Sequence, residues 1–338
     1  MRNESRVNAR NRVLFILVLL CIPVLPCCKQ AEGPAQAPPR FQMSNSFFNV
    51  FFRDLKNGWA VGKLGTLVHT DNGGSYWGRQ NSATDCNLRG LYFTDDTTGW
   101  VVGDRGTIRH TVNGGSAWAK QESGTEHHLH SVFFFGPDRG FIVGEQGVFL
   151  FTENGGKDWK KRADLKDYLT VEDVPFAVAL FKIIFIDDKH GWIVGDYGRI
   201  FRSTDGGTTW SLQKTGTDAI LLDVEFVDPL NGWAVGEMGT ILHSSDGGIT
   251  WETQTSEITY LMNGVEFADR LEGWICTYGN ILHTTDGGNN WRVQIERKMW
   301  FYDIYTDKNG KIWASGDYGE IMHSFNSGRN WVAQIPYE

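Results

Sequence analysis

Residues 222–254 read LDVEFVDPLNGWAVGEMGTILHSSDGGITWETQ, and this stretch decides the fold. It contains four short segments with the alternating or continuous apolar pattern of β-strands, at 222–226, 233–236, 240–244 and 251–254. The residues between these segments are rich in Gly, Asp, Asn and Pro, which are typical of tight turns. The stretch therefore predicts a four-stranded antiparallel sheet in which each strand pairs with the next.

The same pattern recurs from residue 47 to the end of the chain. A Gly followed by an aromatic residue marks the second strand of each unit, at Trp59, Trp100, Phe141, Trp192, Trp233, Trp274 and Trp313. A later Trp follows in each unit, at Trp77, Trp118, Trp159, Trp210, Trp251, Trp291 and Trp331. Units of about 40 residues with four strands are typical of propeller blades, whose apolar faces only neighbouring blades can cover. We therefore predict an all-β fold over residues 46–338, a seven-bladed β-propeller of four-stranded antiparallel blades. We expect the first blade to meet the last without a strand exchanged between the termini.

The turn between the third and fourth strands carries a sharper motif. Residues 203–210 and 244–251 match the Asp-box, or BNR, pattern Ser-x-Asp-x-Gly-x-Thr-Trp, and residues 284–291 nearly match it. The box residues of these three units are Asp205, Asp246, Asp286, Trp210, Trp251 and Trp291. The other four units have Asn at the Asp position, at Asn72, Asn113, Asn154 and Asn326. A short side-chain oxygen can accept backbone N–H bonds inside its own turn, and Asn does this nearly as well as Asp. We therefore expect a structural role, with calcium binding or catalysis as the alternatives.

The N-terminus predicts export. Four Arg and one Glu precede an almost wholly apolar run over residues 13–25, followed by Pro26, Cys27 and Cys28. A basic head with a short apolar run is typical of a secretory signal peptide over residues 1–28. The ending Leu25-Pro26-Cys27-Cys28 resembles a bacterial lipobox, which implies acylation of Cys28; an ordinary cleaved signal or an uncleaved anchor is the alternative. Residues 29–45 are Pro-rich without an apolar period and predict a flexible tether to a membrane.

Charge and cysteine content exclude several classes of function. The chain has a formal net charge of −8, and removal of residues 1–28 would make it more acidic. Such a protein repels a phosphate backbone, so we expect no nucleic acid partner. Outside the signal region the Cys residues are Cys86 and Cys276, without the spacing of a metal site, and they are either separate thiols or one disulfide. We expect no cofactor and no metal site.

The repeated series of Gly-Trp, Val-Gly-x-x-Gly and Asp-Gly-Gly-x-x-Trp resembles the photosystem II stability/assembly factor family over residues 47–335. The resemblance implies a lumenal seven-bladed propeller that helps to assemble a membrane reaction centre, and that grips its client through a basic patch. This chain departs from that pattern. The turn between the second and third strands begins with a carboxylate in five units, at Asp104, Glu145, Asp196, Glu237 and Asp317, whereas unit one has Lys63. We expect these turns on the face opposite the Asp-boxes, either as plain turn formers or as a rim that binds a basic partner. The departure argues against a reaction-centre client.

Two further features have a functional and a structural interpretation. A His recurs in the third strand, at His69, His110, His243, His283 and His323, one per unit and so too far apart to share a metal. His128 and His130 lie two apart, as a chelating pair would, but without a Cys or carboxylate frame. An insertion of about 10 residues between 162 and 180 breaks the period, and its aromatic residues Tyr168 and Phe176 predict a binding loop.

We therefore expect a non-catalytic scaffold of the cell envelope, a monomer that binds protein partners and is held to the membrane by its N-terminal lipid. The alternative is a secreted Asp-box glycoside hydrolase, similar to sialidases or xyloglucanases. Sialidases need an Arg cluster and an Arg-Ile-Pro motif, and this sequence has neither. A hydrolase would also need one pair of carboxylates that differs from blade to blade, whereas the turn carboxylates recur in register.

Overall fold

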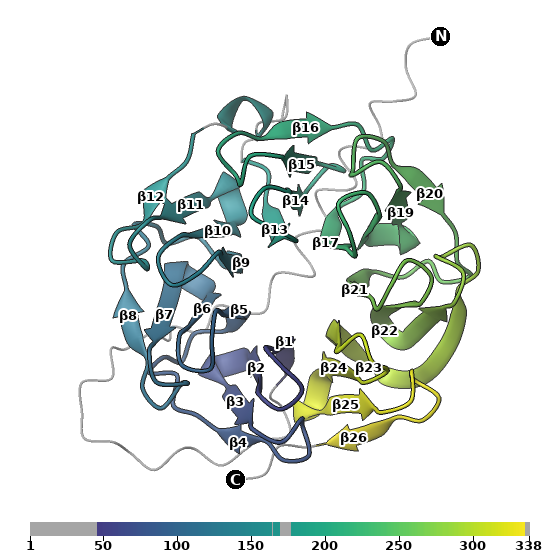
Figure 1. Ribbon diagram of the computed structural model, residues 1–338, viewed down its shortest axis with the longest axis horizontal. Coiled ribbons are helices and arrows are strands. Elements are labelled where there is room, and N and C mark those ends of the chain that lie inside the picture. The colour runs from purple at the N-terminus through teal and green to yellow at the C-terminus, as the bar shows by residue number, and fades with distance from the viewer. Residues whose placement is uncertain (1–45, 164, 170–176, 335–338) are drawn as a thin grey trace. The chain divides into compact units, whose positions relative to one another are not determined.

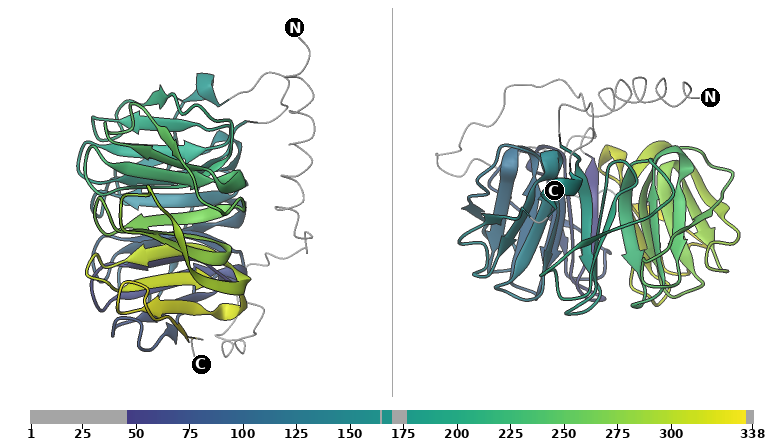
Figure 2. Two further views of the ribbon diagram at one scale, coloured as in Figure 1. Left: turned by 90° about the vertical axis from the view of Figure 1, so that its right-hand side faces the viewer. Right: turned by 90° about the horizontal axis from the view of Figure 1, so that it is seen from above.

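The computed structural model describes residues 46–163, 165–169 and 177–334. The predicted signal peptide, the tether, Cys28 and Phe176 lie outside these residues. The described part of the chain contains β-strands and short 3-10 turns arranged as sheets around one axis (Figure 1). Figure 2 shows the sheets side by side around the ring, with their strands running across its thickness. Within the described ranges, no helix is long and apolar enough to cross a membrane.

Five sheets have four antiparallel strands each, in the order of the sequence. The first sheet comprises β1 (Phe47–Phe52), β2 (Gly58–Gly62), β3 (Leu67–Thr70) and β4 (Gly78–Arg79). The second comprises β5 (Leu88–Phe93), β6 (Gly99–Gly103), β7 (Thr107–Thr111) and β8 (Ala119–Gln121). The third comprises β9 (Leu129–Phe134), β10 (Gly140–Gly144), β11 (Phe149–Thr152) and β12 (Lys160–Lys161). The fourth comprises β13 (Leu180–Phe185), β14 (Gly191–Gly195), β15 (Ile200–Ser203) and β16 (Ser211–Gln213). The fifth comprises β17 (Leu221–Phe226), β18 (Gly232–Gly236), β19 (Ile241–Ser244) and β20 (Glu252–Gln254).

The sixth sheet has six strands and contains the last two sequence units. Its strands are β21 (Met262–Phe267), β22 (Gly273–Thr284), β23 (Arg292–Thr306), β24 (Ile312–Gly316), β25 (Ile321–Ser324) and β26 (Val332–Gln334). The prediction of seven separate blades is therefore wrong: the described residues form six. The cause is β23, which pairs with β22 through its first half and with β24 through its second half. The aromatic markers Trp274 and Trp313 are 39 residues apart, two fewer than the usual spacing of 41. The continuous strand β23 connects the two units in place of a turn.

Short 3-10 turns join the second and third strands of most units. They are η1 (Lys63–Gly65), η2 (Asp104–Gly106), η3 (Glu145–Gly147), η5 (Glu237–Gly239) and η6 (Asp317–Gly319). A further 3-10 turn, η4 (Lys166–Tyr168), lies in the insertion. Because strands alternate in direction, the turns between second and third strands share one face of the ring with the connections between units. Backbone hydrogen bonds confirm this arrangement, for example from Gly239 N–H to the carbonyl of Tyr260 at 2.9 Å.

Burial is greatest in the second strand of each unit and least in the outermost strand. In the fifth unit, all five residues of β18 are buried, whereas β20 has two exposed residues out of three. The inner strand β17 alternates, with Val224 and Phe226 buried and Glu225 partly exposed. Gly232 begins β18 because the ring of Phe226 packs where its Cβ would lie. The sheets therefore bury both faces against neighbouring sheets, as a propeller requires.

Aromatic stacking joins each unit to the next at six of the seven seams, the exception being Trp274, whose neighbouring inner strand ends in Thr306. Trp233 stacks on Phe267 of the following unit, with ring centroids 3.6 Å apart and planes 9° from parallel. Its indole N–H donates to the carbonyl of Gly287, also in the following unit. The same stacking closes the ring, because Trp313 of the last sheet lies 4.0 Å from Phe52 of the first. The expected closure without strand exchange is confirmed for the described residues, since the first sheet contains only β1–β4.

Candidate binding site

The residues nearest the axis come from the inner strand of each unit. Six of these strands, and the second half of β23, have a bulge near their start, so that two successive side chains turn away from the seams. The residue before the last in each inner strand also faces the axis. We call this set the axial collar: Phe51, Tyr92, Phe133, Ile184, Glu225, Glu266 and Tyr305.

The axial collar has an aromatic half and an acidic half. Tyr305, Phe51, Tyr92 and Phe133 follow one another around the ring, with centroid distances of 6.3, 5.4 and 4.9 Å. Glu225 and Glu266 occupy the same register on neighbouring inner strands. The same position thus has different residue types in different units. Residues that only maintain the repeat would be similar in every unit. The collar was not predicted, although its sequence signal is the residue preceding the final Phe of the inner strand in six units and preceding Thr306 in the seventh.

The acidic half of the collar is electrostatically coupled. Burial raises the pKa values of Glu225 and Glu266. The charge of Asp223 adds to the effect at Glu225, and the charge of Glu225 adds to the effect at Glu266. Lys308 lies 3.8 Å from a Glu225 oxygen, and its half-exposed ammonium offsets part of this effect. Repulsion and desolvation thus favour the protonated forms of these carboxyls.

A partly buried ion pair, in which the Lys182 side chain is 28% exposed, lies next to the collar. Lys182 Nζ is 3.0 Å from Asp223 Oδ1, and the side chain of Asp223 is 5% exposed. Burial acts to lower the pKa of Lys182, but Asp223 and Asp303 outweigh burial and raise it. Burial raises the pKa of Asp303, against the effect of Lys182. Lys182 is therefore the positive charge that allows several carboxyls to share the axis.

The five predicted rim carboxylates lie at the turns between second and third strands. Asp104 accepts a bond from Arg89 Nε at 2.5 Å. Asp317 accepts bonds from Ser46 Oγ, the Tyr302 hydroxyl and the Trp300 N–H, at 2.8, 2.9 and 3.1 Å. These two aspartates join their turns to the neighbouring connection, as a turn-forming role requires.

Asp196 interacts electrostatically with the other two rim carboxylates, Glu145 and Glu237. The pKa of Asp196 is raised to about 6 by burial together with the charges of Glu237 and Glu145, although a bond from Ala179 N–H at 2.8 Å acts to lower it. The structure therefore brings Glu145, Asp196 and Glu237 into one acidic sector. The rim as a binding surface for basic partners stays a prediction.

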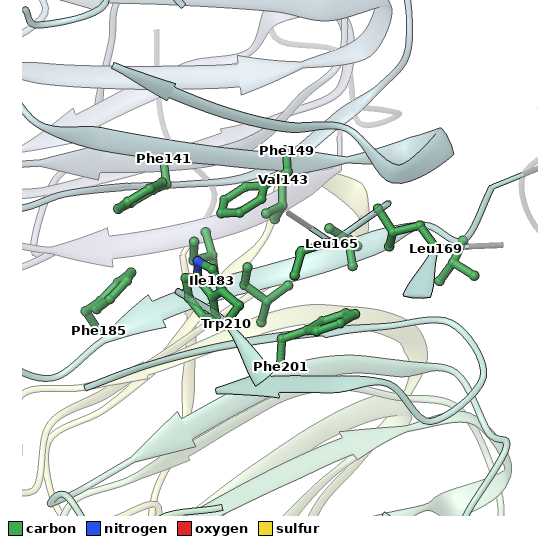
Figure 3. Close-up of a cluster of buried hydrophobic side chains, with 12 residues drawn as sticks. Phe141, Val143, Phe149, Leu165, Leu169, Ile183, Phe185, Phe201 and Trp210 are labelled. Carbon is green, nitrogen blue, oxygen red and sulfur yellow. The ribbon is translucent and has the colours of Figure 1, made fainter. Parts of the chain in front are cut away.

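The insertion is anchored by two leucines. Leu165 and Leu169 are buried between the third and fourth sheets, in a cluster with Phe149 and Phe201 (Figure 3). Tyr168 between them is 42% exposed, and its carbonyl accepts a bond from Arg199 Nε at 2.6 Å. The partner role of this loop stays a prediction, and Phe176 lies outside the described residues.

The Asp-boxes form local hydrogen-bond networks. Asp246 Oδ1 accepts bonds from Ser244 Oγ and the Thr250 N–H, both at 2.9 Å. In a box with Asn, Asn113 Oδ1 accepts the equivalent bonds from Thr111 Oγ1 and Ala117 N–H, also at 2.9 Å. Asp205 and Asp286 do the same in their own units. The box tryptophans Trp210, Trp251 and Trp291 are buried.

The histidines have packing contacts. His69, His110, His243 and His283 each stack on the Trp of the adjacent strand, at 4.6 to 5.1 Å. His128 Nδ1 accepts a bond from Arg105 N–H, whereas His130 packs against Phe181, so the two side chains have different neighbours. Within the described ranges, no group of three or more His, Cys, Asp or Glu residues is placed to hold a metal. Cys276 is a buried free thiol, which excludes a disulfide with Cys86.

Comparison with known proteins identifies related chains. A model of the family described as photosynthesis system II assembly factor YCF48 matches residues 79–171, 164–219 and 210–336. A solved structure described as YCF48 bound to D1 peptide is 20% identical, with a TM-score of 0.67, and the match covers 84% of this chain and 94% of that one. YCF48 from Cyanidioschyzon merolae is 19% identical, with a TM-score of 0.70 and coverage of 85% and 97%.

A GH74 xyloglucanase from Xanthomonas campestris has a similar fold at 11% identity, with a TM-score of 0.68 and coverage of 88% of this chain and 54% of that one. At these identities, the solved structures establish the fold alone. None of the curated proteins matches the chain.

Proposed function

The chain belongs to the family of photosynthesis system II assembly factor YCF48, and on this basis we propose that it is a non-catalytic scaffold that binds a segment of another protein. The observation that carries the proposal is the family match, which spans residues 79–336. One similar propeller is described as bound to a peptide, D1, which is the kind of ligand we propose here. Six of the seven seams are closed by aromatic stacking, so the ring would present its faces as rigid surfaces.

We further propose that the protein acts in the cell envelope as an exported monomer. The basic and apolar N-terminus and the Leu-Pro-Cys-Cys ending support a signal peptide and acylation at Cys28. The Pro-rich residues 29–45 would then separate the propeller from the membrane. Metabolic labelling with a tagged fatty acid tests this: the wild type should take up label, and Cys28→Ser should not. Label that persists in Cys28→Ser would refute acylation at this position.

Crosslinking in living cells, followed by mass spectrometry, tests the scaffold function. We expect the same one or few proteins in repeated experiments, with crosslinks confined to one face of the ring. Each candidate is then purified and titrated against the propeller, and saturable binding at one site is the expected result. Absence of saturable binding by every recovered protein would refute the scaffold function.

Glu225 and Glu266 support a second candidate function, glycoside hydrolysis. They are neighbouring carboxyls with raised pKa values, and hydrolysis uses one protonated and one ionised carboxyl. Both lie on inner strands beside the aromatic collar residues, so a sugar substrate would bind at the axis of the ring. Release of reducing sugars from xyloglucan or a sialoside, abolished in Glu225→Gln, would establish the hydrolase and replace the scaffold proposal.

A further inference from the structure

The turn between the second and third strands has an unusual backbone at its tip. Its middle residue has a left-handed conformation in six units, with φ between 53° and 60°, at Leu64, Arg105, Gln146, Tyr197, Met238 and Tyr318. In the sixth unit, Tyr278 occupies the corresponding place and Gly279 after it has φ of 81°. A residue with a Cβ is disfavoured in this conformation, and Gly or Asn fits it best. None of the six left-handed tips has either residue, whereas in the sixth unit the left-handed residue is Gly279 and Tyr278 precedes it.

The tips differ around the ring in a way that folding does not explain. Five successive units, from the fourth through the seventh to the first, have large apolar or aromatic tips: Tyr197, Met238, Tyr278, Tyr318 and Leu64. The second and third units have Arg105 and Gln146. Four of the apolar tips are well exposed, with Met238 at 59%, Leu64 at 56%, Tyr318 at 55% and Tyr278 at 41%. Leu64, Met238 and Tyr318 combine a large apolar side chain, a left-handed backbone and an exposed surface, which points to a function rather than to stability.

Neighbouring aromatic residues extend these tips into a surface. Tyr260 is 55% exposed and lies beside the Met238 turn. The Gly239 N–H of that turn donates to the Tyr260 carbonyl. Its ring is 6.4 Å from Tyr278, and Tyr278 is 4.8 Å from Trp300. The Trp300 N–H donates to Asp317, which precedes Tyr318. We call the resulting surface the apolar arc: Leu64, Met238, Tyr260, Tyr278, Trp300 and Tyr318.

The charges beside the apolar arc are mostly negative. Glu237 precedes Met238 and Asp317 precedes Tyr318, and the acidic sector of Glu145 and Asp196 adjoins the turn of Glu237. Arg297 near the arc pairs with Glu320 at 3.0 Å, so its charge is offset. Lys63, before Leu64, and the exposed Lys298, two residues before Trp300, oppose this trend. Tyr and Trp are the residue types that dominate binding energy at interfaces, and they also bind cations through their rings.

We propose that the apolar arc is the docking site for an extended segment of a client protein in which aliphatic or aromatic side chains alternate with Arg or Lys. This inference rests on the proposed scaffold function and specifies its surface and the chemistry of its client. Apolar client side chains pack on the exposed tips, and basic client side chains pair with the carboxylates beside them.

Gly substitutions at the tips separate binding from folding. Met238→Gly and Tyr318→Gly remove the side chain and place Gly where the backbone favours it, so the melting temperature should be equal or higher. Arg105→Gly and Gln146→Gly make the same backbone change outside the arc and are the matched controls. The probes are fluorescent 12-residue peptides with identical apolar residues and with Arg, Gln or Glu at the intervening positions.

We expect the full-length protein to bind the Arg peptide with saturation. Met238→Gly and Tyr318→Gly should each weaken this binding at least tenfold, and the two control variants should bind as the wild type does. Equal binding of the Gln or Glu peptide, or unchanged binding by the arc variants, would overturn the inference. Displacement of the Arg peptide by a synthetic peptide of residues 29–45 at lower concentration would instead assign the arc to the chain's own tether, and would also overturn it.

These experiments distinguish failure of the apolar-arc proposal from failure of the scaffold proposal. If a client crosslinks and binds with saturation but does so equally well in Met238→Gly and Tyr318→Gly, the scaffold function stands and the apolar arc is not its site. If the Arg peptide binds the arc but no cellular protein binds with saturation, the scaffold function fails while the surface chemistry holds.

Discussion

Asp303, on the last inner strand, accepts a hydrogen bond at 3.0 Å from the backbone N–H of Val50, on the first inner strand and 253 residues earlier in the chain. The same oxygen accepts a bond from Asn49 Nδ2 at 2.8 Å. Earlier in the ring, Asp223 accepts from the N–H of Val265 and Ser131 accepts from that of Ile183. One side chain near the bulge therefore satisfies a backbone amide of a neighbouring unit, and at Asp303 this bond joins the two ends of the propeller.

Asp303→Ala should destabilise the fold by about 2–3 kcal/mol, because the buried N–H of Val50 loses a charged acceptor. Asp303→Asn keeps an acceptor oxygen and should cost about 1 kcal/mol. Urea unfolding measures both changes. Ser131→Ala is the control, since it removes the same kind of bond between two units within the chain, at the longer distance of 3.3 Å. If Ser131→Ala costs as much as Asp303→Ala, the bond that closes the ring has no special importance.

Lys182 should be essential to stability at neutral pH. Lys182→Met leaves Asp223 and Asp303 without their shared cation, and breaking a buried pair from one side costs about 3–5 kcal/mol. The loss should shrink between pH 8 and pH 5, because the pKa values of Asp303, Glu225 and Glu266 are raised and protons can replace the missing charge. Unfolding free energies of wild type and variant at both pH values measure this.

Lys308→Met is the matched control for that experiment. Lys308 is half exposed and lies 3.8 Å from Glu225, so its loss should cost less than about 1 kcal/mol. A Lys182→Met variant as stable as Lys308→Met at pH 8 would contradict the role of Lys182 as the axial cation.

Asp196 should make the fold less stable as pH rises. Its folded pKa is about 6, against an ordinary value of 3.8, so the folded state holds this proton more tightly than the unfolded state does. Stability from this group is complete below pH 4 and is lost as pH rises through 6, by about 3 kcal/mol in all. Asp196→Asn should remove this loss while keeping an acceptor for the N–H of Ala179.

The measurement for Asp196 is the unfolding free energy at pH 4.5 and pH 7.5, as a difference between wild type and variant. Glu237→Gln should give part of the same effect, since Glu237 contributes to the raised pKa. An identical pH dependence in wild type and Asp196→Asn would show that Asp196 titrates normally.

The features that the sequence predicts correctly depend on residues close together in the chain. Strands such as β17, turns and the contacts between successive units repeat in every unit, so the pattern of one unit predicts the others. The number of blades was predicted wrongly because it depends on whether residues 296–299 interrupt β23. Residues 296–299 contain no Gly or Pro, so the sequence there neither predicts a turn nor excludes one. The two halves of β23 pair with β22 and with β24, and this pairing keeps the connection extended.

The candidate sites were harder to predict because they depend on ring closure. Glu225 and Glu266 are 41 residues apart and look like ordinary outward residues of alternating strands. Only the closed ring brings them to one axis with Tyr305 and Phe51. The strain at Met238 and Tyr318 was likewise hidden, because a residue before Gly in a short turn reads as an ordinary turn position.

The Asp-boxes give a prediction about charge. Asp246→Asn should change stability by less than about 0.5 kcal/mol, since Asn113 makes the two equivalent bonds at the same distances. The second oxygen of Asp246 accepts a bond from the Thr250 hydroxyl, and the Asn amide can replace it by donating to that hydroxyl. Asp246→Ala should cost about 1–2 kcal/mol, because the turn then loses its internal acceptor.

Asn113→Asp and Asn113→Ala make the corresponding changes in a box that has Asn. We expect Asn113→Asp to change stability little and Asn113→Ala to destabilise the fold more. Melting temperatures with calcium and with a chelator complete the test, and they should agree because a neutral amide serves in four of the seven boxes. If Asp246→Asn is as unstable as Asp246→Ala, or if calcium stabilises the wild type and not Asp246→Asn, the carboxylate has a role that requires its charge. In that case the boxes with Asp are cation sites that the boxes with Asn have lost.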